Sequence, residues 1–174
     1  MRTIFLLRHA KSSWEDPAVE DFDRPLTGRG RRAARAMAEY MAKGKIRPAF
    51  VLCSTAQRTR ETYAFIEPKL KGAPVAFEDG VYEASRHDLA HRLRELDDHL
   101  ASVMLVGHNP GLERLAEFLT AGHGAEDAVR RMSDKFPAGA LAILEANVTH
   151  WAELDEGTCR LAGFVRPKDL DQPE

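Results

Sequence analysis

Cysteine is scarce in this sequence of 174 residues, and its two copies, Cys53 and Cys159, lie far apart. Neither belongs to a pair with the two-residue spacing that marks many zinc sites, and two distant cysteines do not make a disulfide framework. Cysteine usage of this kind suits a reducing compartment, so we expect a cytoplasmic protein.

Long apolar runs are also missing. No stretch approaches the ~18 consecutive apolar residues that a membrane-spanning helix requires. The apolar start, residues 4–7, is too short for a signal peptide and ends at the charged Arg8. We therefore expect neither a membrane span nor a secretion signal.

Charge of one sign is not in excess, since the formal net charge is −2. This balance gives no general reason to expect binding to nucleic acid or to a membrane surface. Recognition of an anion must then come from a local cluster of positive groups. The length and the hydrophobic content of 44% suit one domain. We expect a monomer with a domain at residues 1–166 and a C-terminal tail at residues 167–174.

Strand and helix patterns alternate through the first two thirds of the chain, which predicts a parallel sheet with right-handed crossovers. The fold class is α/β: a three-layer α/β/α sandwich with antiparallel strands added at the C-terminal end. A turn at residues 155–157 is expected to join the last two strands as a hairpin. The predicted strands are residues 4–7, 50–53, 74–77, 103–106, 140–144, 149–154 and 158–165.

Four helices are predicted between these strands. The first follows Thr27 as N-cap and is closed by Gly44, and the second is capped by Ser54 or Thr55. The third carries leucines with helical spacing from residue 89 to residue 100. The fourth begins after residue 111 and ends at Gly122, and the segment that follows is expected to be a loop.

Three of the predicted parallel strands end in residues that bind or transfer phosphate. The first ends at Arg8 and His9, the second leads to Arg58 in the next helix, and the fourth ends before His108. The carboxyl ends of parallel strands share one edge of the sheet, where ligands bind. Arginine forks and helix N-termini both favour oxyanions. The sequence therefore predicts a phosphoryl site at this edge.

A histidine in such a site can act as a nucleophile when a ring nitrogen is unprotonated and aimed at phosphorus. Burial and nearby cations both favour the neutral ring. Phosphoryl transfer otherwise needs positioning and charge neutralisation. We expect Arg8, Arg58 and His108 to supply these to His9 without a metal ion or another cofactor.

These segments resemble the histidine phosphatase (phosphoglycerate mutase-like) superfamily. The matching segments, in order, are R-H-A at the first strand end, R-P-L-T-G-R-G from residue 24, S-T-A-Q-R-T-R-E-T after the second strand, and G-H-N-P-G after the fourth. The short length and the form R-H-A-K-S-S-W resemble its small SixA-type phosphohistidine phosphatase branch. The resemblance implies a phosphoglycerate mutase-like fold.

The resemblance also implies roles for individual residues. His9 becomes phosphorylated, and Arg8, Arg58 and His108 form the phosphate pocket. Many members of the family have an acidic proton donor after the third strand, where Glu83 stands in this chain, although some SixA-type members lack it. Ala10 replaces the glycine of the usual R-H-G. Only about eight residues separate the third strand from the next helix, so we expect an open pocket.

Several residues have a second interpretation. Ser12 either binds a phosphate oxygen or caps the turn, and Trp14 either lines the mouth of the site or packs over it. His87 and His91 have the spacing of a zinc pair on one helix face. Their neighbours Arg86 and Asp88 favour an ordinary solvated face, and no third ligand accompanies them.

The leading functional hypothesis is a metal-independent phosphatase that removes phosphate from phosphohistidine in a protein, through a phosphohistidine intermediate at His9. An open site favours this bulky substrate. Two alternatives stay open: a phosphatase for small phosphomonoesters, and a module that binds a phosphorylated partner without turnover. The partner is thus a phosphorylated protein or a small phosphorylated molecule.

Overall fold

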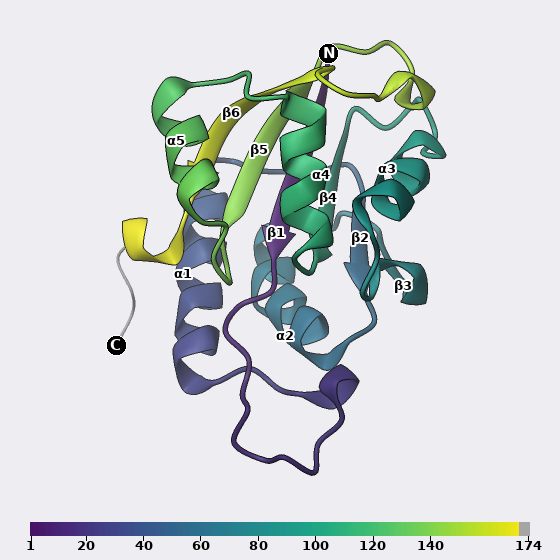
Figure 1. Ribbon diagram of the computed structural model, residues 1–174. Helices are drawn as coiled ribbons and strands as arrows, with labels where there is room; N and C mark the ends of the chain where they lie inside the picture. The colour runs from purple at the N-terminus through teal and green to yellow at the C-terminus, as the bar shows by residue number, and fades with distance from the viewer. Residues whose placement is uncertain (171–174) are drawn as a thin grey trace.

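The computed structural model describes residues 1–170. A six-stranded sheet lies between two layers of helices, as Figure 1 shows. This arrangement confirms the predicted three-layer α/β/α sandwich. Among the described residues, no helix is both long and apolar enough to cross a membrane.

The strand order is β3-β2-β4-β1-β5-β6. The first four strands run parallel, whereas β1 pairs with β5, and β5 with β6, in antiparallel fashion. The mixed sheet with antiparallel strands added from the C-terminal end is therefore as predicted. The strands are β1 (Arg2–Arg8), β2 (Val51–Ser54), β3 (Val75–Glu78), β4 (Ser102–Gly107), β5 (Leu141–Ala146) and β6 (Cys159–Val165).

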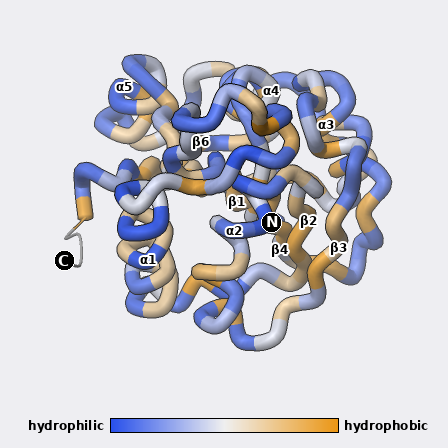
Figure 2. The backbone as a smooth tube through the Cα atoms, turned by 90° about the horizontal axis from the view of Figure 1, so that it is seen from below, coloured by the Kyte–Doolittle hydropathy of each residue, from blue (hydrophilic) through white to orange (hydrophobic). Residues whose placement is uncertain are grey.

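Helices cover both faces of the sheet (Figure 1). Side chains of α1 and α2 pack in one hydrophobic core, and those of α3, α4 and α5 pack in the other. Figure 2 shows β2, β3 and β4 mostly in orange, with many hydrophilic segments on the elements around them. The helices are α1 (Gly28–Lys43), α2 (Gln57–Ile66), α3 (Arg86–Arg94), α4 (Gly111–Thr120) and α5 (Glu126–Asp134).

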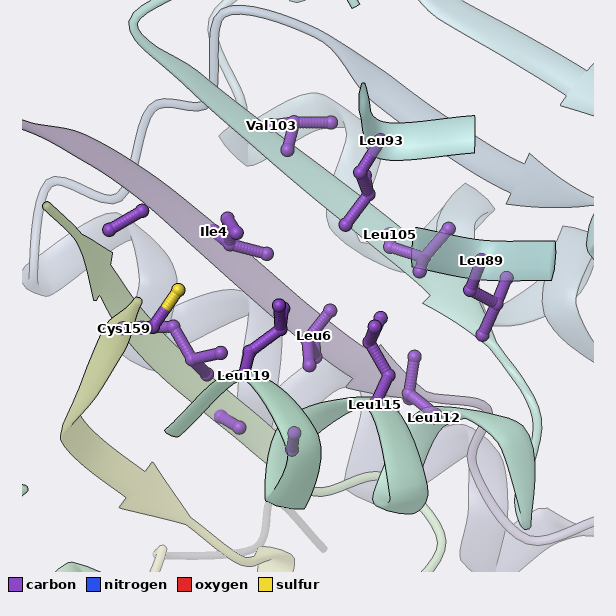
Figure 3. Close-up of a cluster of buried hydrophobic side chains, with 14 of the residues drawn as sticks. Ile4, Leu6, Leu89, Leu93, Val103, Leu105, Leu112, Leu115, Leu119 and Cys159 are labelled. Carbon is purple, nitrogen blue, oxygen red and sulfur yellow. The ribbon is translucent and has the colours of Figure 1, made fainter. Parts of the chain in front are cut away.

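The strand β1 separates the two cores. Ile4 and Leu6 are fully buried against α4, where Figure 3 shows them near Leu115 and Leu119. Phe5 and Leu7 belong to the core on the other face. Successive side chains of a strand point to opposite faces, so a strand covered on both sides reads as a continuous apolar run.

The first helix begins and ends where predicted. The Thr27 hydroxyl oxygen accepts a hydrogen bond from the Gly30 amide at 2.9 Å, and Gly44 is the C-cap. Gly30 also permits close contact between α1 and the turn after β1. A Cβ atom at this position would lie 2.1 Å from the carbonyl oxygen of Lys11.

The predicted strand at residues 149–154 is wrong. Trp151–Glu153 form a 3-10 helix, and the buried Trp151 donates from Nε1 to the carbonyl oxygen of Leu100 at 3.0 Å. The residues at 155–157 form a turn that leads into β6, but β6 pairs with β5. The predicted hairpin between the last two strands is therefore wrong as well.

Other boundaries also differ from the predictions. The segment predicted as a loop after α4 contains α5, whose buried residues are Ala128 and Met132. The third helix ends at Arg94, so the leucines at 96 and 100 lie beyond it. The N-cap of α2 is Ala56, and neither Ser54 nor Thr55 caps that helix.

The C-terminal segment begins with a short structured turn. Pro167–Asp169 form a 3-10 helix, and Leu170 packs against the core next to α1. Residues 171–174 of the predicted tail lie outside the described residues. The division between a domain at residues 1–166 and a tail from residue 167 stays a prediction.

Candidate active site

The carboxyl ends of β1 and β4 bring two histidines together. Arg8 lies beside Gly107 in the sheet, and the His9 amide donates to the Gly107 carbonyl oxygen at 3.1 Å. His9 and His108, which directly follow Arg8 and Gly107, are therefore neighbours. The rings of His9 and His108 have centroids 5.3 Å apart.

His9 is buried and has one ring nitrogen committed to the backbone. Its Nδ1 lies 2.7 Å from the carbonyl oxygen of Ala10, which can only accept a hydrogen bond. The proton of the neutral ring is therefore on Nδ1, and Nε2 carries the lone pair. Burial, together with the nearby charges of His108 and Arg8, lowers the pKa of His9 to about 3. The ring is thus a neutral base at physiological pH.

The turn that holds His9 is fixed from two sides. The Ala10 amide donates to Thr62 Oγ1 at 3.0 Å, and that hydroxyl donates to the carbonyl oxygen of Arg58 at 2.7 Å. On the other side, the Gly139 amide donates to the His9 carbonyl oxygen at 2.8 Å. These contacts hold the backbone of this turn in place relative to α2.

The second helix places Arg58 in its first turn, as expected from the sequence. The guanidinium is buried and donates to the Asp21 carbonyl oxygen at 2.7 Å and to Asp21 Oδ2 at 3.1 Å. Arg8 is held differently, since its Nη1 donates to the carbonyl oxygen of Phe136 at 3.0 Å. The two arginines therefore come from different elements, and each is held by a hydrogen bond to a backbone carbonyl oxygen.

His108 contacts the end of β2. Its Nε2 lies 2.7 Å from the Ser54 hydroxyl, which also accepts a hydrogen bond from the Ala56 amide at 3.3 Å. We assign the serine hydrogen to Nε2, which leaves the ring proton of His108 on Nδ1. Burial, followed by the positive charge of Arg58, lowers the pKa of His108 to about 4.

Three buried nitrogen atoms in this cluster have no hydrogen-bond partner within residues 1–170. They are Nε of Arg8, Nε of Arg58 and Nδ1 of His108. Buried N–H groups are almost always paired, so unpaired donors that share a site are unusual. They come from the end of β1, the first turn of α2 and the residue after β4, and the charges of all three residues act on His9. An acceptor with several oxygen atoms, such as a phosphoryl group, would satisfy them.

A network centred on Asp21 was not predicted from the sequence. This carboxylate accepts from the Tyr82 hydroxyl at 2.6 Å, from Arg24 at 3.1 Å and from Arg58 at 3.1 Å. The Tyr82 hydrogen bond and the two arginines lower the pKa of Asp21 to about 2. Asp21 is thus an anion that holds Arg58 in place.

Arg24 belongs to the same network and is almost fully buried. It follows an acidic stretch of the sequence and has only 6% of its surface exposed. The guanidinium stacks on the Trp14 ring at 3.5 Å from the centroid, and Trp14 itself is largely exposed. The sequence signal for this residue was the R-P-L-T-G-R-G segment that it begins.

The remaining candidates lie at the edge of the cluster. Glu83 is exposed, has a positive φ of 54° and lines a pocket of about 510 Å³ together with Arg58 and His108. The Ser12 hydroxyl oxygen accepts a hydrogen bond from Arg24 Nη1 at 2.6 Å. Its own hydrogen is left for a second acceptor.

His87 and His91 are exposed on α3. Within the part of the chain that the structure describes, no three His, Cys, Asp or Glu side chains form a group that could hold a metal ion. Cys53 and Cys159 are both buried and free.

Comparisons with known proteins identify the family of this chain. The family model of the histidine phosphatase superfamily (branch 1) matches residues 4–150. An uncharacterized protein of Mycobacterium tuberculosis is 34% identical over 163 residues, which cover 93% of this chain and all of that protein. An uncharacterized chloroplastic protein of Arabidopsis thaliana is 31% identical over 95% of this chain and 78% of its own length.

A solved structure extends the match to three dimensions. The crystal structure of a proposed phosphohistidine phosphatase SixA from Agrobacterium tumefaciens has a TM-score of 0.81 and 31% identity, and covers 95% of this chain and 98% of that one. The family model covers Arg8 at the end of β1, His9 and His108 directly after β1 and β4, and the helix that carries Arg58. The chain therefore belongs to the histidine phosphatase superfamily, within its SixA-type branch.

Proposed function

We propose that this protein is a phosphatase that works through a phosphohistidine at His9 and removes phosphate from phosphohistidine in a protein substrate. The observation that carries the proposal is the His9 ring itself. Its Nε2 has a free lone pair, and the residues whose charges act on this ring, Arg8, Arg58 and His108, each have a buried nitrogen without a partner.

The proposed reaction has two steps. Nε2 of His9 attacks phosphorus, a new N–P bond forms, and the bond to the leaving group breaks with its electron pair. Water then attacks the phosphorus of the phosphohistidine and releases inorganic phosphate and the neutral imidazole. The pKa of about 3 keeps His9 unprotonated, so the nucleophile is available throughout the neutral range.

Arg8, Arg58 and His108 are proposed to hold the phosphoryl oxygens in both steps. The two arginines supply positive charge, and Nδ1 of His108 supplies a hydrogen bond. Charge neutralisation of this kind is the task that divalent ions perform in many other phosphoryl transfers. We therefore expect activity to be unchanged in excess chelator.

The site favours a leaving group that needs little help from an acid. The Asp21 carboxyl, with a pKa of about 2, is a poor proton donor, and Glu83 lies exposed at the pocket edge. The imidazole of a phosphohistidine is a better leaving group than an alkoxide and places less demand on an acid. Residues 79–85, with one 3-10 turn, connect β3 with α3, and so short a segment leaves room for a protein substrate.

The pocket beside Glu83 keeps a second candidate open. Its volume of about 510 Å³ and the lining residues Arg86 and Arg114 suit a small phosphomonoester. Glu83 would then serve as the proton donor that an alkoxide leaving group requires.

The test compares substrates on one protein preparation in excess chelator. A phosphorylated histidine-containing domain, a sugar phosphate and a chromogenic aryl phosphate are assayed for released phosphate. We expect the largest kcat/KM for the phosphorylated domain. Faster turnover of the sugar phosphate would support the second candidate. Binding of the phosphorylated domain without turnover of any substrate would refute a phosphatase.

The same proposal places the protein in the cytoplasm as a monomer with one domain at residues 1–166. Its two free cysteines, both buried, are consistent with a reducing compartment.

A further inference from the structure

A basic groove begins at Arg8, next to the proposed nucleophile. It has a volume of about 490 Å³ and shares no lining residue with the pocket beside Glu83. Its walls come from segments far apart in the sequence: the ends of β1 and α5, the start of α1 and the turn after β6. The cationic residues that line the basic groove are Arg8, Lys11, Arg29, Lys135, Arg166 and Lys168.

Few anions offset this charge. Asp169 forms an ion pair with Arg166 at 2.8 Å. Among residues 1–170, no carboxylate forms an ion pair with Lys11, Arg29, Lys135 or Lys168. The whole protein carries a formal net charge of −2, so the basic groove is a local excess of positive charge. Such a surface attracts negatively charged partners and raises their rate of association.

The floor of the groove is fixed to the proposed nucleophile. Pro137 and Ala138 form part of the lining, and the next residue, Gly139, donates its amide to the carbonyl oxygens of Arg8 and His9 at 3.1 and 2.8 Å. A ligand in the basic groove would therefore lie at a constant position relative to the His9 ring.

The lining combines exposed cations with small apolar surface. Lys11, Lys135 and Lys168 are exposed, while the half-buried Pro137 and Ala138 offer apolar contact. A second phosphate group would be better served by buried donors that converge on one point. Separate, exposed charges along an apolar floor suit an extended polypeptide with several carboxylates.

We propose that the basic groove binds an acidic segment of the phosphorylated protein substrate, beside the phosphohistidine that enters the active site. This inference rests on the proposed function and names the surface property that its substrate must have. Carboxylates that flank the phosphohistidine would contact the lysines, and the phosphoryl group would reach Arg8 and His9.

The test reverses two charges that are distant from the proposed catalytic groups. The variant Lys135→Glu/Lys168→Glu changes the basic groove. The control Lys43→Glu/Arg47→Glu makes the same change in charge at the other end of α1, where Lys43 is the last helical residue and Arg47 lies just beyond it. That helix has 16 residues, so its ends are about 24 Å apart. Both variants are assayed on phosphohistidine peptides with acidic or with lysine-rich flanks, and on phosphoramidate.

We expect the groove variant to lose about tenfold in kcat/KM on the acidic peptide, with the loss shrinking at high salt. The control should retain its rate on that peptide. Both variants should hydrolyse phosphoramidate as the wild type does, which shows that the active site is intact. An equal kcat/KM of groove variant and wild type on the acidic peptide would overturn the inference.

A binding measurement separates this inference from the proposed function. A fluorescent acidic peptide without phosphate is titrated with each protein, and anisotropy gives Kd. If the wild type hydrolyses no phosphohistidine, the proposed function fails, and the peptide titration still decides on the groove. Binding that is about tenfold weaker only in the groove variant supports the inference, and equal binding overturns it. If the groove variant loses kcat/KM only on a bisphosphorylated sugar, that result would overturn the inference and assign the groove to a second phosphate group.

Discussion

Acidification should destabilise this protein through two buried histidines, well before its carboxylates are protonated. The pKa is about 3 for His9 and about 4 for His108, both below the ordinary value of 6.5. As pH falls through 6.5, the unfolded chain binds protons that the folded protein does not. The stability that the folded protein gains from its neutral histidines is therefore fully present above pH 6.5. It is lost as the pH falls toward the two pKa values of the folded state.

The size of the effect follows from these shifts. Each histidine lowers the free energy of unfolding by about 1.4 kcal/mol for every pH unit below 6.5. Between pH 7 and pH 4.5 the two together reduce the free energy of unfolding by roughly 5 kcal/mol. Both side chains are only 7% exposed, so solvent screening takes little from this value. The loss is comparable to the whole stability of a marginal domain.

Urea unfolding at several pH values measures this dependence. We expect His9→Asn and His108→Asn each to remove about half of the loss between pH 7 and pH 4.5, because each removes one proton uptake. His87→Asn, at an exposed position on α3, is the matched control. An unchanged pH dependence in the double variant of His9 and His108 would refute the reasoning, since other groups would then bind the protons. Asp21 does not affect this measurement between pH 7 and pH 4.5, because its contribution to the free energy of unfolding is lost only below pH 3.8.

Three further substitutions test the site. In Glu83→Gln we expect severe loss on alkyl phosphates, mild loss on phosphohistidine and scarcely any on a nitrophenyl ester; equal losses would leave Glu83 with a role in pocket shape only. In His108→Ala we expect kcat to fall at least ~100-fold with the fold retained by circular dichroism, and a smaller effect would remove it from the oxyanion contacts. Gly30→Ala should reduce the free energy of unfolding by ~1–3 kcal/mol, because its Cβ would lie 2.1 Å from the Lys11 carbonyl oxygen. Gly80→Ala, where nothing lies within 4 Å, should not change it.

The sequence predicted the parts of the fold that depend on local pattern. The strand β1 is covered on both faces, and its four apolar residues therefore form an uninterrupted run. The convergence of Arg8, His9, Arg58 and His108 required only the rule that parallel strands end at one edge. These predictions needed no knowledge of distant contacts.

The features that were missed depend on tertiary contacts. The helix α5 buries only Ala128 and Met132, too few apolar positions for a clear periodic signal. The segment at residues 149–154 has apolar residues like a strand, but Trp151 is held by the Leu100 carbonyl far away in the sequence. Asp21 meets Tyr82, 61 positions along the chain, and nothing in its own acidic neighbourhood indicates that contact.

Detection of the phosphoenzyme tests the central proposal most directly. The protein is mixed with a substrate that carries radiolabelled phosphate, quenched in alkaline detergent, and digested for localisation of the label by mass spectrometry. We expect a label that is stable in alkali, lost in acid and located on His9, and we expect none in His9→Ala. A wild type that turns over substrate while the label lies on another residue, or a His9→Ala variant that retains normal turnover, would contradict the proposal that His9 is the nucleophile.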